Sequence, residues 1–337
     1  MKKCLHARRS KEGARIGLRD GHAGWRGLAT CKRIWECMGC QACKKRKESD
    51  ILKLCMAEHR AAGRSSLMVS VTIRHAWDDD LKALRKGVAR AWSAMLEGRA
   101  WKNFCKEWGL WGGCKAVEVT RGPSGWHPHI HAVLIFERWL TDDEMAIVEE
   151  ELWKRWQTCV VRHLGKKHEP EWPVGLKLTR CTRSEQYISK LNLEVLDPAM
   201  AKRAKSGRRS WAQLMQDATS GEDAGAVHRL HEFAVAMKGA KMVDRFGAMR
   251  AQWKRVREQL DDDQGVDDVQ FDFPPDVYDA IREHGNAKLD LLKEAKLHGI
   301  EGVRRYVARV LGDYAASRIQ RLTEARGPPG MPLSSIS

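Results

Sequence analysis

The residues with the clearest capacity for chemistry are three histidines that follow one another at every second position. They are His127, His129 and His131, and they lie within a stretch that ends in apolar residues. In a β-strand, residues two apart share one face, so the three imidazoles are expected to point the same way. Imidazoles that converge from one strand face are typical ligands of a divalent metal ion. The alternative is a stripe of histidines on the protein surface.

A hairpin before this strand supplies a candidate third ligand. A turn centred on residues 123–124 would pair Glu118 with His129. Cross-strand neighbours lie roughly 5 Å apart, so Glu118, His129 and His131 form a plausible triad, and His127 is the rival third ligand. Such a mixed nitrogen and carboxylate set with open positions suits Mn²⁺ or Mg²⁺ acting as a Lewis acid on a phosphate.

Tyr187 is the candidate nucleophile for such a phosphate. The chain has four tyrosines, and the other three lie far along the chain, at Tyr278, Tyr306 and Tyr314. On a helix, Tyr187 and Lys190 would share a face. A free tyrosine is only about 0.1% ionised at pH 7, and a neighbouring ammonium and a metal-bound phosphate would raise that fraction. The alternative is a tyrosine half-buried between a helix and the sheet.

Ten cysteines in a chain with no visible secretory signal indicate a reducing compartment, with thiols or metal ligands in place of disulfides. Four of them crowd together and are candidate ligands of a structural Zn²⁺: Cys31, Cys37, Cys40 and Cys43. Cys4, His6 and His22 are further candidates to complete such a site. Free thiols are the alternative.

The net charge of +16 is concentrated in two regions. Residues 1–66 carry 17 basic and six acidic residues, and residues 177–209 carry nine basic and three acidic residues. This pattern favours a polyanionic partner, with nucleic acid first and a membrane surface second, while solvated tails are the alternative. No apolar run is long enough to span a bilayer. The candidate DNA-binding residues are Arg180, Arg183, Lys202, Arg203, Arg208 and Arg209.

The elements that must position these residues follow an α+β order. Strands are expected over 67–73, 114–120, 127–136 and 174–180, and helices over 44–62, 81–95, 141–163 and 184–193. From residue 67 the order is β-α-β-β-α-β-α, which matches a ferredoxin-like split βαβ fold with an antiparallel sheet and helices on one face.

Composition predicts a division of the chain into six segments. These are a basic cysteine-containing segment over 1–66, a histidine-bearing domain over 67–198, a helical extension over 199–260, an acidic linker over 261–275, a helical C-terminal region over 276–325 and a loose tail over 326–337.

Several of these motifs resemble those of rolling-circle plasmid replication initiators, in the HUH endonuclease superfamily. The segment Gly125–His131 resembles the histidine motif of that family, and Tyr187–Lys190 resembles its tyrosine motif. Three more segments are similar to other parts of the family, and they are Val69–His75, Cys31–Cys40 and Lys205–Leu214. The resemblance covers roughly residues 28–255 and makes residues 67–198 the expected HUH nuclease domain.

The resemblance implies metal-dependent nicking of one DNA strand at a plasmid origin. His129 and His131 would hold the ion that polarises the scissile phosphate, and Tyr187 would attack it. The products would be a 5′-phosphotyrosine and a free 3′-hydroxyl, and the covalent link would later permit strand closure without ATP. The implied partners are single-stranded or cruciform origin DNA, a host helicase and the host DNA polymerase, in the bacterial cytoplasm.

One departure from the family pattern concerns termination. A glutamate four residues before the tyrosine would be suited to activate water, but Arg183 occupies that position. Glu185 lies on another helix face, and Glu194 lies on the face of the tyrosine. The terminating role is therefore not assigned to a residue.

Other functions share part of this pattern. A relaxase would place its tyrosine before the histidines, and a single-tyrosine transposase has the same order but is usually about half as long. A zinc- and DNA-binding regulator without catalysis would not need Tyr187. A metallohydrolase with a histidine pair on a barrel strand would need repeated β/α units, which this sequence lacks.

Overall fold

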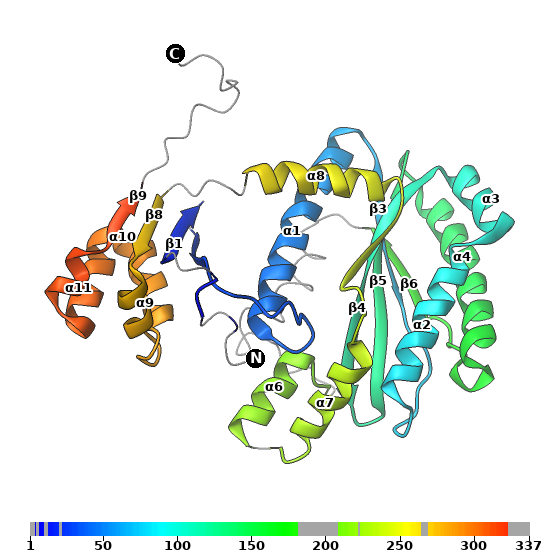
Figure 1. Ribbon diagram of the computed structural model, residues 1–337. Helices are drawn as coiled ribbons and strands as arrows, with labels where there is room; N and C mark the ends of the chain where they lie inside the picture. Colours follow the sequence, from blue (N-terminus) through cyan, green and yellow to red (C-terminus); the bar gives the residue numbers. More distant parts are fainter. Residues whose placement is uncertain are drawn as a thin grey trace. The chain divides into compact units, whose positions relative to one another are not determined.

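The structure is a computed structural model that describes residues 4, 7–9, 13–19, 22–180, 208–221, 223–263 and 269–322. It divides into two compact units (Figure 1). The larger unit comprises residues 33–258, and the smaller unit comprises residues 1–32 together with 259–337. This division differs from the six segments expected from composition, because strands near the two ends of the chain pair with each other.

The larger unit is built on an antiparallel sheet of five strands in the order β6-β3-β5-β4-β7. The strands are β3 (Ser65–Val71), β4 (Leu110–Gly122), β5 (Gly125–Phe136), β6 (Leu176–Arg180) and β7 (Val243–Gly247). Four of them lie where the sequence predicts strands. The expectation of an all-helical segment over 199–260 is wrong at β7, a strand of five residues that pairs with the edge of β4.

Three helices lie on one side of this sheet. The helices α2 (Leu81–Met95) and α3 (Gly98–Trp108) follow β3, and α4 (Asp142–Leu164) follows the β4–β5 hairpin. Asp80 caps α2 by accepting a hydrogen bond from the backbone of Ala83. A capping box begins α4, since Thr141 and Glu144 each bond the other's backbone N–H, and the helix lies where the sequence predicts one. Helix α3 was not expected from the sequence.

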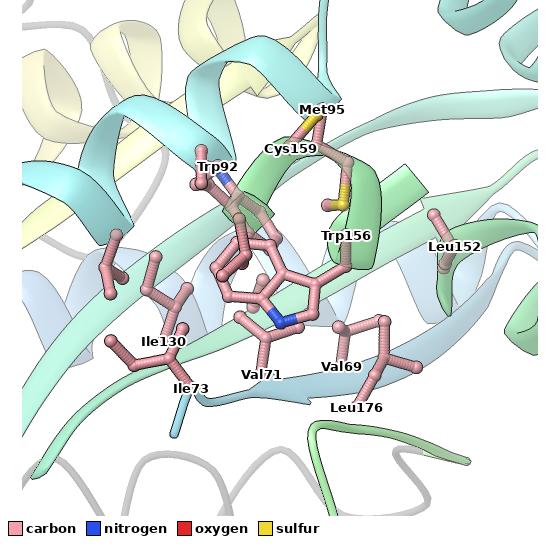
Figure 2. Close-up of a cluster of buried hydrophobic side chains, with 14 of the residues drawn as sticks. Val69, Val71, Ile73, Trp92, Met95, Ile130, Leu152, Trp156, Cys159 and Leu176 are labelled. Atoms are coloured by element: carbon pink, nitrogen blue, oxygen red, sulfur yellow. The ribbon is translucent and has the colours of Figure 1, made fainter. Parts of the chain in front are cut away.

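Apolar side chains of α2 and α4 pack onto the sheet and form the main core (Figure 2). Trp92 and Trp156 are buried above Ile130, which is fully buried on β5. Burial of one large apolar side chain contributes roughly 1.5–3 kcal/mol, so this face of β5 is strongly preferred as the inner face. A shift of one residue would reverse the faces, and the core therefore holds His129 and His131 on the opposite face.

Figure 1 shows α1 (Met38–Ala61) and α8 (Met249–Asp263) on the other side of the sheet from α2 and α4. His59 of α1 is fully buried and lies 2.8 Å from the side-chain oxygen of Gln252 on α8. Glu58 accepts a hydrogen bond from Arg255. The expectation of helices on one face only is therefore wrong, and α1 begins six residues before the predicted start at residue 44.

Two shorter helices, α6 (Trp211–Ser220) and α7 (Ala226–Met237), extend the same core. Ser210 and Gln213 form a capping box at the start of α6. The ring of Phe233 on α7 lies 6.4 Å from that of Trp211 and 6.3 Å from that of Trp126. A short 3-10 helix, η1 (Lys166–His168), lies between α4 and β6.

The smaller unit contains a four-stranded antiparallel sheet in the order β2-β1-β8-β9. Its elements are β1 (Ala14–Arg19), β2 (His22–Arg26), β8 (Val269–Phe273), α9 (Pro275–Ile281), α10 (Ala287–Leu311), α11 (Asp313–Ser317) and β9 (Gln320–Leu322). The acidic linker expected over 261–275 therefore contains the strand β8. Phe271 and Phe273 alternate with polar residues there and are buried in the core of this unit.

Among the described residues, α1 has 24 residues, and α10 has 25 residues that are interrupted by a kink at Gly299. Both carry charged side chains along their length. Within the described part of the chain, no helix is both long enough and apolar enough to cross a membrane.

Candidate metal centre on the histidine strand

Three neighbouring strands bring the candidate ligands together. The hairpin register pairs Glu118 of β4 with His129 of β5, as the turn position predicts. On the other side of β5, Ser70 of β3 pairs with His131. Residues that pair in this way share a face, so these four side chains lie on the face opposite the main core.

His131 is bonded on both sides of its ring. Its Nε2 lies 2.9 Å from a carboxylate oxygen of Glu118, and its Nδ1 lies 2.9 Å from the hydroxyl of Ser70. A carboxylate only accepts, so Nε2 donates to Glu118, and the hydroxyl of Ser70 is the partner of Nδ1. Glu118 and His131 are thus already placed as neighbours, and a divalent ion would take the place of the shared proton.

His127 is held by a chain of hydrogen bonds that determines its tautomer. The Nδ1 of His75 lies 2.9 Å from the carbonyl oxygen of Ser124, and the Nε2 of His75 lies 2.6 Å from the Nδ1 of His127. The Nε2 of His127 lies 2.7 Å from the hydroxyl of Thr72. Because the carbonyl only accepts, a neutral His75 donates there, His127 donates to His75, and Thr72 donates to His127. Both ring nitrogens of His127 are therefore engaged by the protein.

Burial keeps the imidazoles neutral. Burial lowers the pKa of His129 to about 4, an effect that Glu118 opposes and that Arg208 reinforces. Burial likewise lowers the pKa of His127 to about 2, with help from the neighbouring histidines. The rings of His127 and His129 stack with their centroids 3.9 Å apart. Neutral imidazole is the form that binds metal, so at pH 7 protons do not compete for these rings.

The donor set fits a catalytic ion better than a structural one. Two imidazoles and one carboxylate leave coordination positions open, and Mn²⁺ and Mg²⁺ accept such mixed sets. Within the described residues, Glu118, His129 and His131 do not bring three ligand atoms within 4.8 Å of one another.

His75 is a residue of this site whose role the sequence did not reveal. It lies in the loop between β3 and α2, and Asp79 secures that loop by accepting hydrogen bonds from the Ala76 backbone and from Lys167. The hairpin turn packs closely against the same loop. Gly125 has a φ of +99°, and a Cβ there would lie 2.6 Å from the carbonyl oxygen of Ala76. The only signal in the sequence was the position of His75 at the end of the segment Val69–His75.

A second candidate metal centre is formed by cysteines. In the smaller unit, Cys4 and Cys31 form a cysteine cluster with their sulfur atoms within 4.8 Å of each other, and the predicted ligands Cys37 and Cys40 belong to the larger unit. The backbone N–H of Cys31 also donates to the sulfur of Cys4 at 3.3 Å. Cys43 is exposed and is not a member of the group, so Cys4 takes the place predicted for it. Sulfurs around a tetrahedral zinc lie about 3.8 Å apart, and this cluster could hold a metal ion such as zinc.

The other predicted site residues fall into two groups. Five lie outside the described residues, and they are Tyr187, Lys190, Arg183, Lys202 and Arg203. Of the remaining cations, Arg180 donates to Asp142 and to the carbonyl of Leu140, next to the Phe136 end of the sheet. Arg209 is paired with Asp217 at 3.1 Å. Arg208 is exposed beside the β4–β5 turn, where its charge reaches the histidines.

Comparison with known proteins gives one partial similarity. The chain is 28% identical over 136 residues to a Streptomyces lividans protein named "Protein rep". The matched region is 32% of this chain, and it spans 30% of the length of that protein. No protein-family model matches the sequence, and no solved structure matches the fold. The similarity supports a Rep-like replication protein.

Proposed function

We propose that this chain is a plasmid replication initiator of the rolling-circle type, which nicks one DNA strand at an origin through a tyrosine. The observation that carries the proposal is the grouping of Glu118, His129 and His131 on one face of adjacent strands. The partial similarity to a protein named Rep supports a replication role independently of that geometry. The site- and strand-specific endonuclease reaction itself is the finer part of the proposal.

The strand order supports an HUH nuclease domain. The four strands of the β-α-β-β-α-β series are β3, β4, β5 and β6 in chain order. In the sheet they lie in the order β6-β3-β5-β4, which is fourth, first, third, second. This is the order of a split βαβ, ferredoxin-like sheet. In such a sheet the first and third strands are central, which places His129 and His131 in the middle of the sheet with neighbours on both sides.

In the proposed mechanism Glu118, His129 and His131 hold Mn²⁺ or Mg²⁺, which when bound polarises the scissile phosphate as a Lewis acid. Glu118 is favoured over His127 as the third ligand, because Thr72 and His75 already occupy the two ring nitrogens of His127. The protein's own contribution is to keep His127 and His129 neutral by burial and to orient the imidazoles through hydrogen bonds.

The proposed nucleophile is Tyr187, assisted by the ammonium of Lys190. The phenol oxygen would form a bond to phosphorus, and the bond from phosphorus to the 3′-oxygen would break. The phenol proton leaves to solvent, and the 3′-oxygen takes up a proton to become the free primer end. The products are a 5′-phosphotyrosine and a 3′-hydroxyl, and the reverse reaction closes the strand. The proposed partners are origin DNA, a host helicase and the host polymerase, in the bacterial cytoplasm.

A second candidate function is a zinc- and DNA-binding regulator without catalysis. The cysteine cluster favours it, because neighbouring thiols suit a structural Zn²⁺. Such a regulator would bind DNA through basic residues and would have no use for a tyrosine. The two candidates therefore differ in whether a covalent DNA adduct forms.

The test is covalent capture of DNA by the full chain. The protein is incubated with Mn²⁺ and a randomised pool of single-stranded DNA, denatured, and analysed by mass spectrometry of its tyrosine peptides. We expect a nucleotide adduct on the peptide that contains Tyr187 and its complete loss in Tyr187→Phe. Tyr314→Phe removes a tyrosine that is 79% exposed and should leave the adduct unchanged. An adduct that persists in Tyr187→Phe would contradict the proposed nucleophile, and no adduct in the wild type would favour the regulator.

A further inference from the structure

An exposed tryptophan stands beside the candidate metal centre. Trp77 is 67% exposed, and it lies in the loop that also carries His75. This loop is secured by Asp79 and packs against the hairpin turn, where a Cβ on Gly125 would lie 2.9 Å from the Cα of Trp77. The large apolar ring is thus presented to solvent on a fixed backbone, which costs free energy unless a partner covers it.

Two arginines accompany Trp77. The guanidinium carbon of Arg121 lies 5.5 Å from the ring centre of Trp77 and 5.2 Å from that of the buried Trp126. The side chain of Arg208 lies over the hairpin turn, where a Cβ on Gly122 would be 3.1 Å from its Cγ. No carboxylate of the described segments forms an ion pair with Arg121 or Arg208. Their positive charge is therefore available to an anion.

The same patch adjoins the histidines. His75 precedes Trp77 by two residues and bonds directly to His127. Arg208 is close enough for its charge to lower the pKa of His127 and His129, although burial is the larger cause. An anion drawn to these arginines would lie next to the face that holds the candidate metal ligands.

We propose that Trp77, together with Arg121 and Arg208, is a stacking platform that binds one base of single-stranded DNA beside the phosphate held at the histidine site. Every base has a flat π-face that can stack on an exposed indole, and arginines next to the ring can bind the adjoining phosphates. A base inside a duplex has no free face, so the platform selects unpaired DNA. The position beside the reacting phosphate rests on the proposed function.

The sheet offers a matched control at its other end. Trp139 is 63% exposed and also has an arginine over its ring, with the guanidinium carbon of Arg180 at 4.3 Å from the centroid. Arg180 is committed to Asp142 and to a backbone carbonyl. Trp139 follows the Phe136 end of β5, whereas Trp77 packs against the Gly125 end. The two tryptophans are alike in exposure and differ in the charge and the site beside them.

The experiment compares two single-stranded probes without added Mn²⁺ or Mg²⁺, so that metal-dependent nicking does not contribute. One is oligothymidylate of about 20 nucleotides, and the other is an abasic strand of the same length with an intact phosphate backbone. The full chain should bind oligothymidylate more tightly than the abasic strand. Trp77→Ala should weaken oligothymidylate binding by about 5- to 150-fold and leave abasic binding unchanged. Trp77→Phe should restore part of the loss, and Trp139→Ala should bind both probes as the wild type does.

The outcomes separate this inference from the nicking chemistry. Equal loss of binding to both probes in Trp77→Ala, or no loss to either, would overturn the platform. A loss as large in Trp139→Ala would overturn it as well. If the DNA adduct at Tyr187 fails to form but Trp77 still governs the preference for bases, the nicking proposal falls and the stacking platform stands. If the adduct forms and Trp77→Ala binds both probes normally, only the platform falls.

Discussion

The histidine group and the cysteine cluster are two candidate metal centres built in different ways. Glu118, His129 and His131 lie on paired strands, so strand alternation and hairpin register determine their positions. The cysteine cluster recruits Cys4, which lies 27 residues before Cys31 along the chain. The first group is therefore assembled by regular local geometry, and the second depends on where a distant segment of the chain returns.

The two groups also differ in donor chemistry. The histidine group offers nitrogen and oxygen donors with positions left open for a substrate, which suits a catalytic Mn²⁺ or Mg²⁺. The cysteine cluster offers sulfur donors, which suit a zinc site that stabilises the fold. Removal of one ligand should therefore affect stability most in the cysteine cluster, and metal-dependent chemistry most in the histidine group.

The largest effect is expected from Cys4→Ser. If the cluster binds zinc, this change should remove most of the bound zinc and destabilise the protein strongly, because structural zinc contributes on the order of 10 kcal/mol to the folding of small metal-dependent domains. Zinc content by atomic emission and thermal unfolding would measure both. Cys43→Ser is the matched control, since Cys43 is exposed and lies outside the cluster. Equal zinc loss in the two variants would show that Cys4 matters no more for zinc binding than Cys43 does.

A smaller effect is expected from Glu118→Gln at the histidine group. Loss of the carboxylate should weaken Mn²⁺ binding by on the order of 100-fold, measured by calorimetric titration. His127→Gln should weaken it less, because both nitrogens of His127 are bonded to Thr72 and His75. The double change His129→Ala with His131→Ala serves as the reference for complete loss. A greater loss of Mn²⁺ affinity in His127→Gln than in Glu118→Gln would make His127 the third ligand in place of Glu118.

The smallest expected effect is a loss of folding stability in the metal-free protein as the pH falls. Burial gives His127 and His129 pKa values of about 2 and about 4, below the ordinary 6.5. Below pH 6.5 these two imidazoles bind protons in the unfolded chain but not in the folded chain. Folding stability is therefore highest above pH 6.5 and falls as the pH drops below that value. We expect a loss of about 1 kcal/mol for each ring between pH 7.5 and 5.5.

Urea unfolding in EDTA at the two pH values measures this loss. His163→Gln, an exposed position on α4, should leave the pH dependence unchanged. His127→Gln should reduce it. A pH dependence that is identical in wild type and His127→Gln would show that this ring is not held neutral by the fold.

Much of the histidine site could be predicted because it depends on local rules. The turn at residues 123–124 sets the hairpin register, and that register pairs Glu118 with His129 as expected. The apolar residues that alternate with the histidines, such as Ile130, predict which face of the strand is buried. The capping box at Thr141 likewise marks the start of α4. Each of these features involves residues close together in sequence.

Features that join distant segments could not be predicted. The strand β7 has only five residues, too few to stand out in the sequence, and it pairs with the edge of β4, a distant segment. The strand β8 lies in a stretch that composition marks as a linker, and it pairs with β1 near the other end of the chain. His75 becomes part of the site only when its loop folds against the β4–β5 turn.

By itself, the sequence determined the spacing of the histidines, the phase of the strand that carries them and the carboxylate that lies opposite. Tertiary structure decided which hydrogen-bond partners hold His127, which cysteine completes the cluster and which tryptophan is exposed beside the site. The physical reason is the distance along the chain between the residues that determine each feature. Alternation and hairpin register follow from the geometry of a few neighbouring peptide units, whereas hydrogen-bond partners, burial and thiol grouping depend on which remote segments the core brings together.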